Sequence, residues 1–190
     1  MKANFTTAGV DEVGRGCLAG PVVSAAVILK RSAILEEIKD SKKLTFNQRE
    51  KISKNIKKHS FFSIGVASVK EIEKLNILQA SLLSMKRAII KLAVKPKIVL
   101  VDGNFLPEGL NNCKAIIKGD EKVKCISAAS ILAKVYRDKL MIKMSKKYKN
   151  YFWEKNFGYG TKEHIKMLKI FGLSTMHRKN FKPMHNMLLK

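Results

Sequence analysis

The sequence predicts an α/β domain. Short β-rich runs alternate with segments of helical periodicity along its 190 residues, and one helical segment separates two strands as in a crossover connection. A chain of this length buries roughly 70% of the surface that it exposes when unfolded, enough for one substantial core. Because no Gly/Ser-rich or low-complexity stretch interrupts it, we expect residues 1–190 to form a single domain, helical from about residue 150 onward.

The first two expected strands, residues 5–10 and 22–29, are rich in β-forming residues. The Gly-rich turn Gly14-Arg15-Gly16 lies between them. We therefore expect these two strands to form a hairpin.

The middle of the chain alternates in type, with a helix expected at residues 45–58, a strand at 61–69, a helix at 77–93 and a strand at 97–101. Thr45 and Gln48 have the spacing of a capping box, which marks the start of the first helix. Apolar residues recur at helical spacing through the second helix, and Pro96 ends it. The strands on either side of this helix should belong to one sheet.

The last third is mostly helical, with a strand expected at residues 113–117, helices at 123–147, 161–171 and 181–189, and a turn at 156–160. Small residues dominate the first half of the long helix, which allows close packing against a sheet. Thr161 is a suitable N-cap for the helix that begins there.

Basic residues dominate the charge, with 38 Lys and Arg against 15 Asp and Glu and a formal net charge of +23. A positive field of this size concentrates polyanions, so nucleic acid is the leading class of partner. Ribosomal and membrane-surface proteins share such an excess. The acidic residues must therefore decide between catalysis on nucleic acid and binding alone.

No apolar run approaches the ~18 residues of a membrane span, and the first residues carry no secretory apolar segment. We therefore expect a cytoplasmic protein that does not enter a membrane. The three cysteines, Cys17, Cys113 and Cys125, include no Cys-x-x-Cys pair. We expect them to be reduced thiols in the core, not a disulfide framework or a zinc site.

Four acidic residues lie near expected strand ends, where functional sites are common. Asp11 and Glu12 directly follow the first strand, Asp102 follows the strand at 97–101, and Asp120 lies just beyond the strand at 113–117. Taken singly, these residues also fit a turn aspartate, a surface glutamate or the start of a helix.

If these carboxylates gather, cations must hold them together, because a phosphate backbone repels bare carboxylates. Oxygen ligands favour Mg²⁺ or Mn²⁺. Two such ions about 4 Å apart would activate a water, bridge the scissile phosphate and stabilise the leaving 3′-oxygen. Without ions and substrate, we expect the carboxylates to be able to stand apart.

Several motifs follow one another along the chain. The first is Gly9-Val10-Asp11-Glu12-Val13-Gly14-Arg15-Gly16, followed by Leu18-Ala19-Gly20-Pro21-Val22. The later ones are Asp40-Ser41-Lys42-Lys43-Leu44, Val101-Asp102-Gly103, Lys118-Gly119-Asp120, the segment from Ser127 to Asp138, Gly158-Tyr159-Gly160-Thr161 and His177-Arg178. In this order they resemble the motifs of the ribonuclease HII family, the type 2 ribonucleases H. Cys17 and Val13 depart slightly from the family pattern, and neither touches the carboxylates.

The resemblance implies a ribonuclease H-like fold, a mixed five-stranded sheet flanked by helices with a C-terminal helical segment. It implies that Asp11, Glu12, Asp102 and Asp120 are the catalytic residues and bind divalent Mn²⁺ or Mg²⁺. It also implies an endonuclease that hydrolyses the RNA strand of RNA/DNA hybrids. The enzyme would cut 5′ of ribonucleotides embedded in duplex DNA, leaving a 3′-hydroxyl and a 5′-phosphate.

Two motifs are expected to recognise the substrate. The glycines of Gly14-Arg15-Gly16 allow close backbone approach, and by resemblance this segment contacts the ribose 2′-hydroxyl that distinguishes RNA from DNA. An ordinary hairpin turn is the alternative. By resemblance, Tyr159 packs on the deoxyribose beside the ribonucleotide, whereas a core tyrosine is the alternative. We therefore expect the enzyme to recognise an RNA–DNA junction.

Hydroxyl and amine side chains near these motifs are expected to hold flanking phosphates: Lys42, Lys43, Ser127, Ser130 and Lys134. For any single lysine, a solvated surface position is the alternative. Asp138 should pair with Arg137 or with a lysine one helical turn away and should not bind metal. His164 and His177 lack metal-ligand spacing, and we assign neither a catalytic role.

Two alternative functions are compatible with parts of the sequence. The sister ribonuclease HIII family carries an extra N-terminal domain, whereas the acidic motif here begins 10 residues from the start, which argues against that family. The other alternative is a non-catalytic nucleic-acid-binding protein of the same fold. Replacement of one of the four carboxylates would support it, but all four are present. We expect a monomer.

Overall fold

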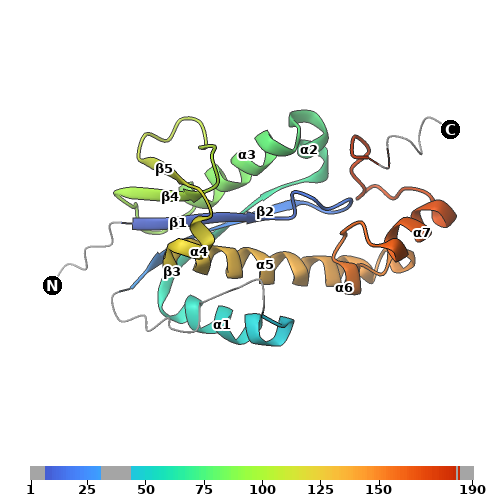
Figure 1. Cartoon of the computed structure of the whole chain (residues 1–190), viewed down its shortest axis with the longest axis horizontal. Coiled ribbons are helices and arrows are strands. Elements are labelled where there is room, and N and C mark those ends of the chain that lie inside the picture. Colours follow the sequence, from blue (N-terminus) through green and yellow to red (C-terminus); the bar gives the residue numbers. More distant parts are fainter. Residues whose placement is uncertain (1–6, 31–43, 183, 185–190) are drawn as a thin grey trace.

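The computed structural model describes residues 7–30, 44–182 and 184. Five strands form one mixed sheet in the order β3-β2-β1-β4-β5 (Figure 1). They are β1 (Thr7–Val13), β2 (Val22–Leu29), β3 (Ser60–Ala67), β4 (Ile98–Asp102) and β5 (Cys113–Ile116). The expected α/β class and mixed five-stranded sheet are confirmed.

The helical elements lie on both sides of this sheet and at one end of it (Figure 1). They are α1 (Phe46–Lys58), α2 (Val69–Leu75), α3 (Ile77–Ile90), α4 (Gly119–Lys122), α5 (Lys124–Ser145), the 3-10 turn η2 (Lys149–Tyr151), α6 (Trp153–Asn156) and α7 (Lys162–Phe171). No described helix is both long and apolar enough to cross a membrane.

The register of the central strands sets the position of the carboxylates. β1 pairs antiparallel with β2, as expected for the hairpin, and parallel with β4. Val10 lies opposite Val101 in the parallel ladder. Asp11 and Asp102 each follow one of these valines, so they lie at the same end of two neighbouring strands.

The sheet is buried on both faces because its strands alternate their apolar side chains. On β2, Ala25 and Val27 pack with α5 and α1, whereas Ala26 and Ile28 pack with α3. A Cβ added at Gly9 would lie 2.2 Å from the carbonyl carbon of Cys125. The glycine therefore lets α5 lie directly against β1.

The structure corrects the expected boundary of the first strand. Asp11 and Glu12 do not follow this strand but belong to it, because β1 continues to pair with β2 through Val13. Helix α2 was not expected at all. Its signal was present, since Ser68 and Glu71 form a capping box of the same kind as Thr45 and Gln48.

The remaining expectations have mixed outcomes. Cys17 and Cys125 are buried thiols as expected, and Cys113 is only partly buried against the core. The short elements η2 and α6 lie in the part expected to be helical, although neither was expected as a separate element. The helix expected at residues 181–189 lies largely outside the described residues, as do Lys42 and Lys43.

Candidate active site

A cavity of about 370 Å³ lies at the carboxyl ends of β1 and β4. All four predicted carboxylates line it: Asp11, Glu12, Asp102 and Asp120. The other lining residues are Val13, Arg49, Ser130, Ile131, Lys134 and Tyr159. The structure thus brings together acidic side chains from three separate segments of the chain.

The turn between β5 and α5 orients the third and fourth carboxylates. Lys118 takes a left-handed conformation with φ +54°, after which the short helix α4 begins. The Gly119 N–H donates to Asp102 Oδ1 at 2.6 Å, and the Asp120 N–H lies 3.4 Å from the same oxygen. Asp102 therefore ties β4 to the segment that carries Asp120.

Burial and neighbouring negative charge act on the carboxyls of Asp11 and Glu12. Burial raises the pKa of Asp11 well above its usual range, and the charges of Glu12 and Asp102 raise it further. Burial also raises the pKa of Glu12, although Arg15 lies 3.2 Å away and opposes the shift. Protons or cations would relieve this repulsion.

The carboxylates share the cavity without meeting at one point. Among the residues that the structure describes, no three Asp, Glu, His or Cys side chains converge to hold a single ion. All four cavity carboxylates nevertheless offer the oxygen atoms that hard divalent cations prefer. The donor set fits Mg²⁺ or Mn²⁺ in its chemistry, while its spacing is wider than a closed coordination sphere.

Lys134 supplies positive charge beside the carboxylates. Its Nζ donates to Asp138 Oδ1 at 2.9 Å and lies 5.3 Å from the centre of the Tyr159 ring. The expected pairing of Asp138 with a lysine one turn away is confirmed. Arg137 is not the partner, because consecutive helical residues do not face each other.

The loop after β1 follows directly on Glu12 and Val13, which line the cavity. Gly14 is buried with φ +96°, and a Cβ there would lie 2.3 Å from Arg137 Nε. Arg15 and Gly16 are exposed, and a Cβ on Gly16 would meet open space. Gly14 is therefore required by packing, whereas Gly16 leaves the backbone accessible from outside.

Tyr159 reaches the cavity from the segment after α6. Its side chain is hydrogen-bonded to Cys17, and burial raises the pKa of its phenol to about 12. The phenol therefore stays protonated at neutral pH. Tyr159 is still 36% exposed, so part of its surface remains available to a ligand.

The two serines of α5 differ. Ser130 lines the cavity and is hydrogen-bonded to Asp11. This hydrogen bond partly opposes the rise in the pKa of Asp11 that burial causes. The Ser127 hydroxyl donates to the carbonyls of Asp120 and Val123 within its own segment. A phosphate contact by Ser127 stays a prediction, and those of Lys42 and Lys43 concern residues outside the described part.

Sequence reasoning missed the polar residues buried behind these loops. Arg137 and Arg178 are fully buried, and so is His164, while His177 is 1% exposed. The His177-Arg178 motif was noticed, but no spacing in the sequence reveals its contacts. Their hydrogen bonds go mainly to backbone carbonyls, which every residue carries.

Known proteins resemble this chain in sequence and in fold. The sequence profile described as ribonuclease HII matches residues 8–184. The chain is 59% identical over 183 residues to the ribonuclease HII of Pelagibacter ubique (strain HTCC1062), covering 95% of this chain and 98% of that one. It also resembles the crystal structure of ribonuclease H2 from Pyrococcus horikoshii OT3, with a TM-score of 0.79, 29% identity and 95% of each chain covered.

The fold extends to more distant proteins. The structure of Bst-RNase HIII in complex with Mn²⁺ gives a TM-score of 0.80 at 19% identity, with 98% of this chain and 70% of that chain covered. At this identity the likeness concerns the fold alone. The helices and sheet described above are therefore shared between two sister groups of enzymes.

Proposed function

The chain belongs to the ribonuclease HII family, and we propose that it cuts 5′ of ribonucleotides embedded in duplex DNA as well as in the RNA strand of RNA/DNA hybrids. It is a nuclease, a hydrolase of the ribonuclease H type. The proposed products are a 3′-hydroxyl and a 5′-phosphate. Such a reaction suits the excision of ribonucleotides and the removal of hybrids.

Four carboxylates lining one cavity in a chain of net charge +23 carry this proposal. The repulsion among Asp11, Glu12 and Asp102 would be a liability in a protein that only bound phosphates. It becomes useful when cations stand between the carboxylates and a phosphate. This arrangement favours phosphodiester hydrolysis over simple binding.

The cavity would hold divalent Mg²⁺ or Mn²⁺, two ions in the working complex, through Asp11, Glu12, Asp102 and Asp120. When bound, such ions supply an activated water and stabilise charge at the scissile phosphate. Because no three of the described acidic, His or Cys side chains converge at present, binding would have to draw these carboxylates closer together.

The remaining cavity residues would bind and orient the substrate. Lys134, held by Asp138, is near enough to the carboxylates to contact a flanking phosphate. The exposed backbone at Arg15 and Gly16 would meet the 2′-hydroxyl. The part-exposed Tyr159 ring would pack on the neighbouring deoxyribose.

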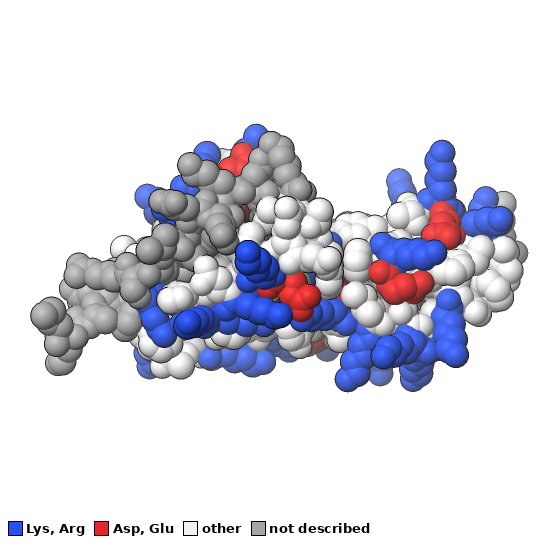
Figure 2. Space-filling model, turned by 90° about the horizontal axis from the view of Figure 1, so that it is seen from below, with Lys and Arg blue, Asp and Glu red and all other residues white. Residues whose placement is uncertain are grey.

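A basic face adjoins these elements. Figure 2 shows many Lys and Arg side chains and few acidic ones over α1, α5 and the C-terminal helices. Exposed lysines on α1 and α5 include Lys51, Lys54, Lys57, Lys139 and Lys143. Such a face favours a duplex over a single nucleotide as substrate. Each phosphate that a lysine contacts releases counterions, so a duplex with many phosphates gains more affinity.

The test is cleavage of a labelled DNA duplex with one ribonucleotide, assayed with Mg²⁺, with Mn²⁺ and with chelator. We expect metal-dependent cutting 5′ of the ribonucleotide and no cutting of an all-DNA control. Cutting of long hybrids alone would contradict the assignment of Arg15, Gly16 and Tyr159 to junction recognition. Binding without cutting in either metal would contradict the proposed chemistry.

A further inference from the structure

Residues 174–178 are hydrogen-bonded directly to the loop after β1 and, through His164, to the backbone of Tyr159. These are the two loops assigned to substrate recognition. We propose that this segment is a common anchor, in which Arg178 orients the backbone at Arg15 and Gly16 while His177 acts through His164 on Tyr159. These are positioning residues, since none of them lines the cavity. The inference rests on the proposed function for the roles of the two loops.

Arg178 holds the first loop by its carbonyls. Its Nη1 donates to Arg15 O at 2.8 Å, its Nη2 to Gly14 O at 2.7 Å, and its Nε to Gly20 O at 3.0 Å. In a trans peptide the carbonyl and the following N–H point in opposite directions. Turning the carbonyls of Gly14 and Arg15 inward therefore turns the N–H groups of Arg15 and Gly16 away from Arg178, as donors for a 2′-hydroxyl.

The hydrogen bonds of His177 fix the positions of its protons. The Ser174 N–H donates to Nδ1 of His177 at 2.9 Å, so this nitrogen must be an acceptor. Burial lowers the pKa of His177 to about 4, so the ring is neutral at pH 7. Its single proton is therefore on Nε2, which lies 3.0 Å from His164 Nε2.

The proton of His164 follows from the same network. Its Nε2 accepts from His177 and also from the Trp153 indole N–H at 3.1 Å. The His164 proton must then be on Nδ1, and it donates to the Tyr159 carbonyl at 2.8 Å. A defined chain of hydrogen bonds thus runs from Ser174 to the backbone of Tyr159.

Backbone hydrogen bonds join the two branches. The Arg178 N–H donates to Leu18 O at 2.9 Å and the Gly20 N–H to Met176 O at 2.9 Å, around a bridge between Ala19 and His177. Leu18 in turn donates to Gly158 O at 2.8 Å. The anchor and both loops therefore form one hydrogen-bonded unit.

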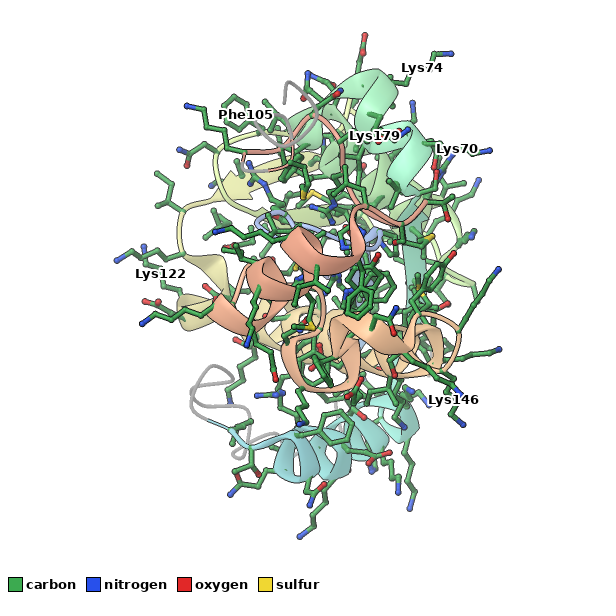
Figure 3. The ribbon with its side chains drawn as sticks, turned by 90° about the vertical axis from the view of Figure 1, so that its right-hand side faces the viewer. Lys70, Lys74, Phe105, Lys122, Lys146 and Lys179 are labelled. Atoms are coloured by element: carbon green, nitrogen blue, oxygen red, sulfur yellow. The ribbon has the colours of Figure 1, made fainter. Side chains whose placement is uncertain are left out.

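The anchor continues toward the opposite side of the sheet. The Lys179 N–H donates to Glu73 Oε1 of α2 at 3.1 Å. Figure 3, which looks at this end of the molecule, shows Lys179 near α2 and its labelled Lys70 and Lys74. The segment that positions the loops is thus held by a helix that contributes nothing to the cavity lining.

Two substitutions of His164 distinguish a role in positioning Tyr159 from a general role in stabilising the fold. Asparagine places an amide near Nδ1 and can keep the bond to the Tyr159 carbonyl, whereas glutamine places its amide near Nε2 and loses that bond. Both remove a buried imidazole. The measurement is the ratio of kcat/KM on a single-ribonucleotide duplex to kcat/KM on a long RNA/DNA hybrid, with all proteins folded as judged by circular dichroism.

We expect H164Q to lower this ratio about 10- to 100-fold, the size of effect that a small misplacement of a substrate contact produces. H164N should keep the ratio within about threefold, and so should H59Q, the same substitution at a distant helix end. Equal ratios in all four proteins would overturn the inference. An equal fall in H164N and H164Q would also overturn it, since the role would then be structural.

Arg178 is tested by R178K, which keeps the charge but cannot span three carbonyls. Because both substrates carry the 2′-hydroxyl, kcat/KM should fall on both by about tenfold or more, while K179M leaves both unchanged. Unchanged kcat/KM in R178K would overturn this branch.

Nitrogen NMR of the histidines tests the network without any activity assay. The wild-type protein should show His164 protonated on Nδ1 and His177 on Nε2. The opposite tautomers would overturn the inference even if the enzyme cuts as proposed. Failure of the wild-type protein to cut a single-ribonucleotide duplex, with the expected tautomers present, would instead contradict the proposed function.

Discussion

The carboxylate cavity and the anchor at residues 174–178 differ in the surroundings of their buried charged groups. In the cavity, acidic side chains face one another, and the pKa of Asp11 is raised by burial and by its neighbours. Behind the two loops, each guanidinium nitrogen of Arg178 in the anchor and of Arg137 on α5 donates to a backbone carbonyl. In the proposed function the cations complete the cavity, whereas the hydrogen bonds of the two arginines are complete within the fold.

The cavity and the anchor therefore contribute differently to the stability of the fold and to ligand binding. Uncompensated charge lowers the stability of the folded protein and raises its affinity for cations. Satisfied buried charge stabilises one loop geometry and leaves nothing to bind. Substitutions in the cavity should therefore affect activity more than stability, and substitutions of the buried arginines should affect stability strongly.

The largest effect is expected for Asp102→Asn. The asparagine can still accept from the Gly119 N–H, but the loss of its charge should lower the cleavage rate about 10³-fold or more. Binding of duplex should change little, as measured by titration in chelator. Glu108→Gln, the same change at an exposed position outside the cavity, is the control, and equal activity of the two variants would contradict the assignment.

Arg137→Met should have the next largest effect, on stability. Arg137 donates to the carbonyls of Pro21, Ala19 and Phe157, and losing a charge-assisted partner for all three should cost about 3–5 kcal/mol of unfolding free energy. Urea denaturation measures this. The control Lys139→Met, on the same helix as Arg137, removes only an exposed ion pair with Glu50 of α1 and should cost far less. Similar losses of unfolding free energy in the two variants would contradict the difference between buried, hydrogen-bonded charge and exposed charge.

The stability of the anchor should depend on pH through His177. Burial lowers its pKa from 6.5 to about 4, so between these values the unfolded chain binds more protons than the folded protein. Its contribution is present above pH 6.5 and is lost as the pH falls toward 4. We expect a loss on the order of 2 kcal/mol that is smaller in His177→Gln, from denaturation at several pH values. An identical pH dependence in the two proteins would refute this.

The smallest expected effect is an increase in stability. Asp11→Asn removes one of the crowded charges, so in chelator it should raise the melting temperature by about 2–4 °C. Mn²⁺ should stabilise the wild-type protein more than the variant, because the variant lacks one proposed ligand. Differential scanning calorimetry measures both, and a lower melting temperature in the variant would contradict net repulsion in the cavity.

The sequence predicted the cavity better than the anchor for a physical reason. A carboxylate beside an apolar run signals a strand end, which made Asp11 and Asp102 candidates singly. Their gathering in one place was expected only from the resemblance to the ribonuclease HII family, and the parallel pairing of β1 with β4 explains it. Even there, the end of β1 was misjudged, because pairing with β2 extends the strand through two charged residues.

The anchor left almost no such signal. Arg178 acts on carbonyls more than 150 positions away in sequence, and any residue supplies a carbonyl. No ligand spacing singles out His164 and His177 in the sequence, and their hydrogen bond to each other joins residues 13 positions apart. Helix α2 was different, since its capping box at Ser68 and Glu71 could have been recognised.

The parallel pairing of Val10 with Val101 also bears on when the enzyme becomes active. Residues from the start and the middle of the chain must meet before the carboxylates share a cavity, and such long-range pairing forms late in folding. A nascent chain that ends before Asp120 has no complete acidic set. Cutting activity should therefore appear only after most of the protein has been synthesised, which makes it a direct reporter of completed folding.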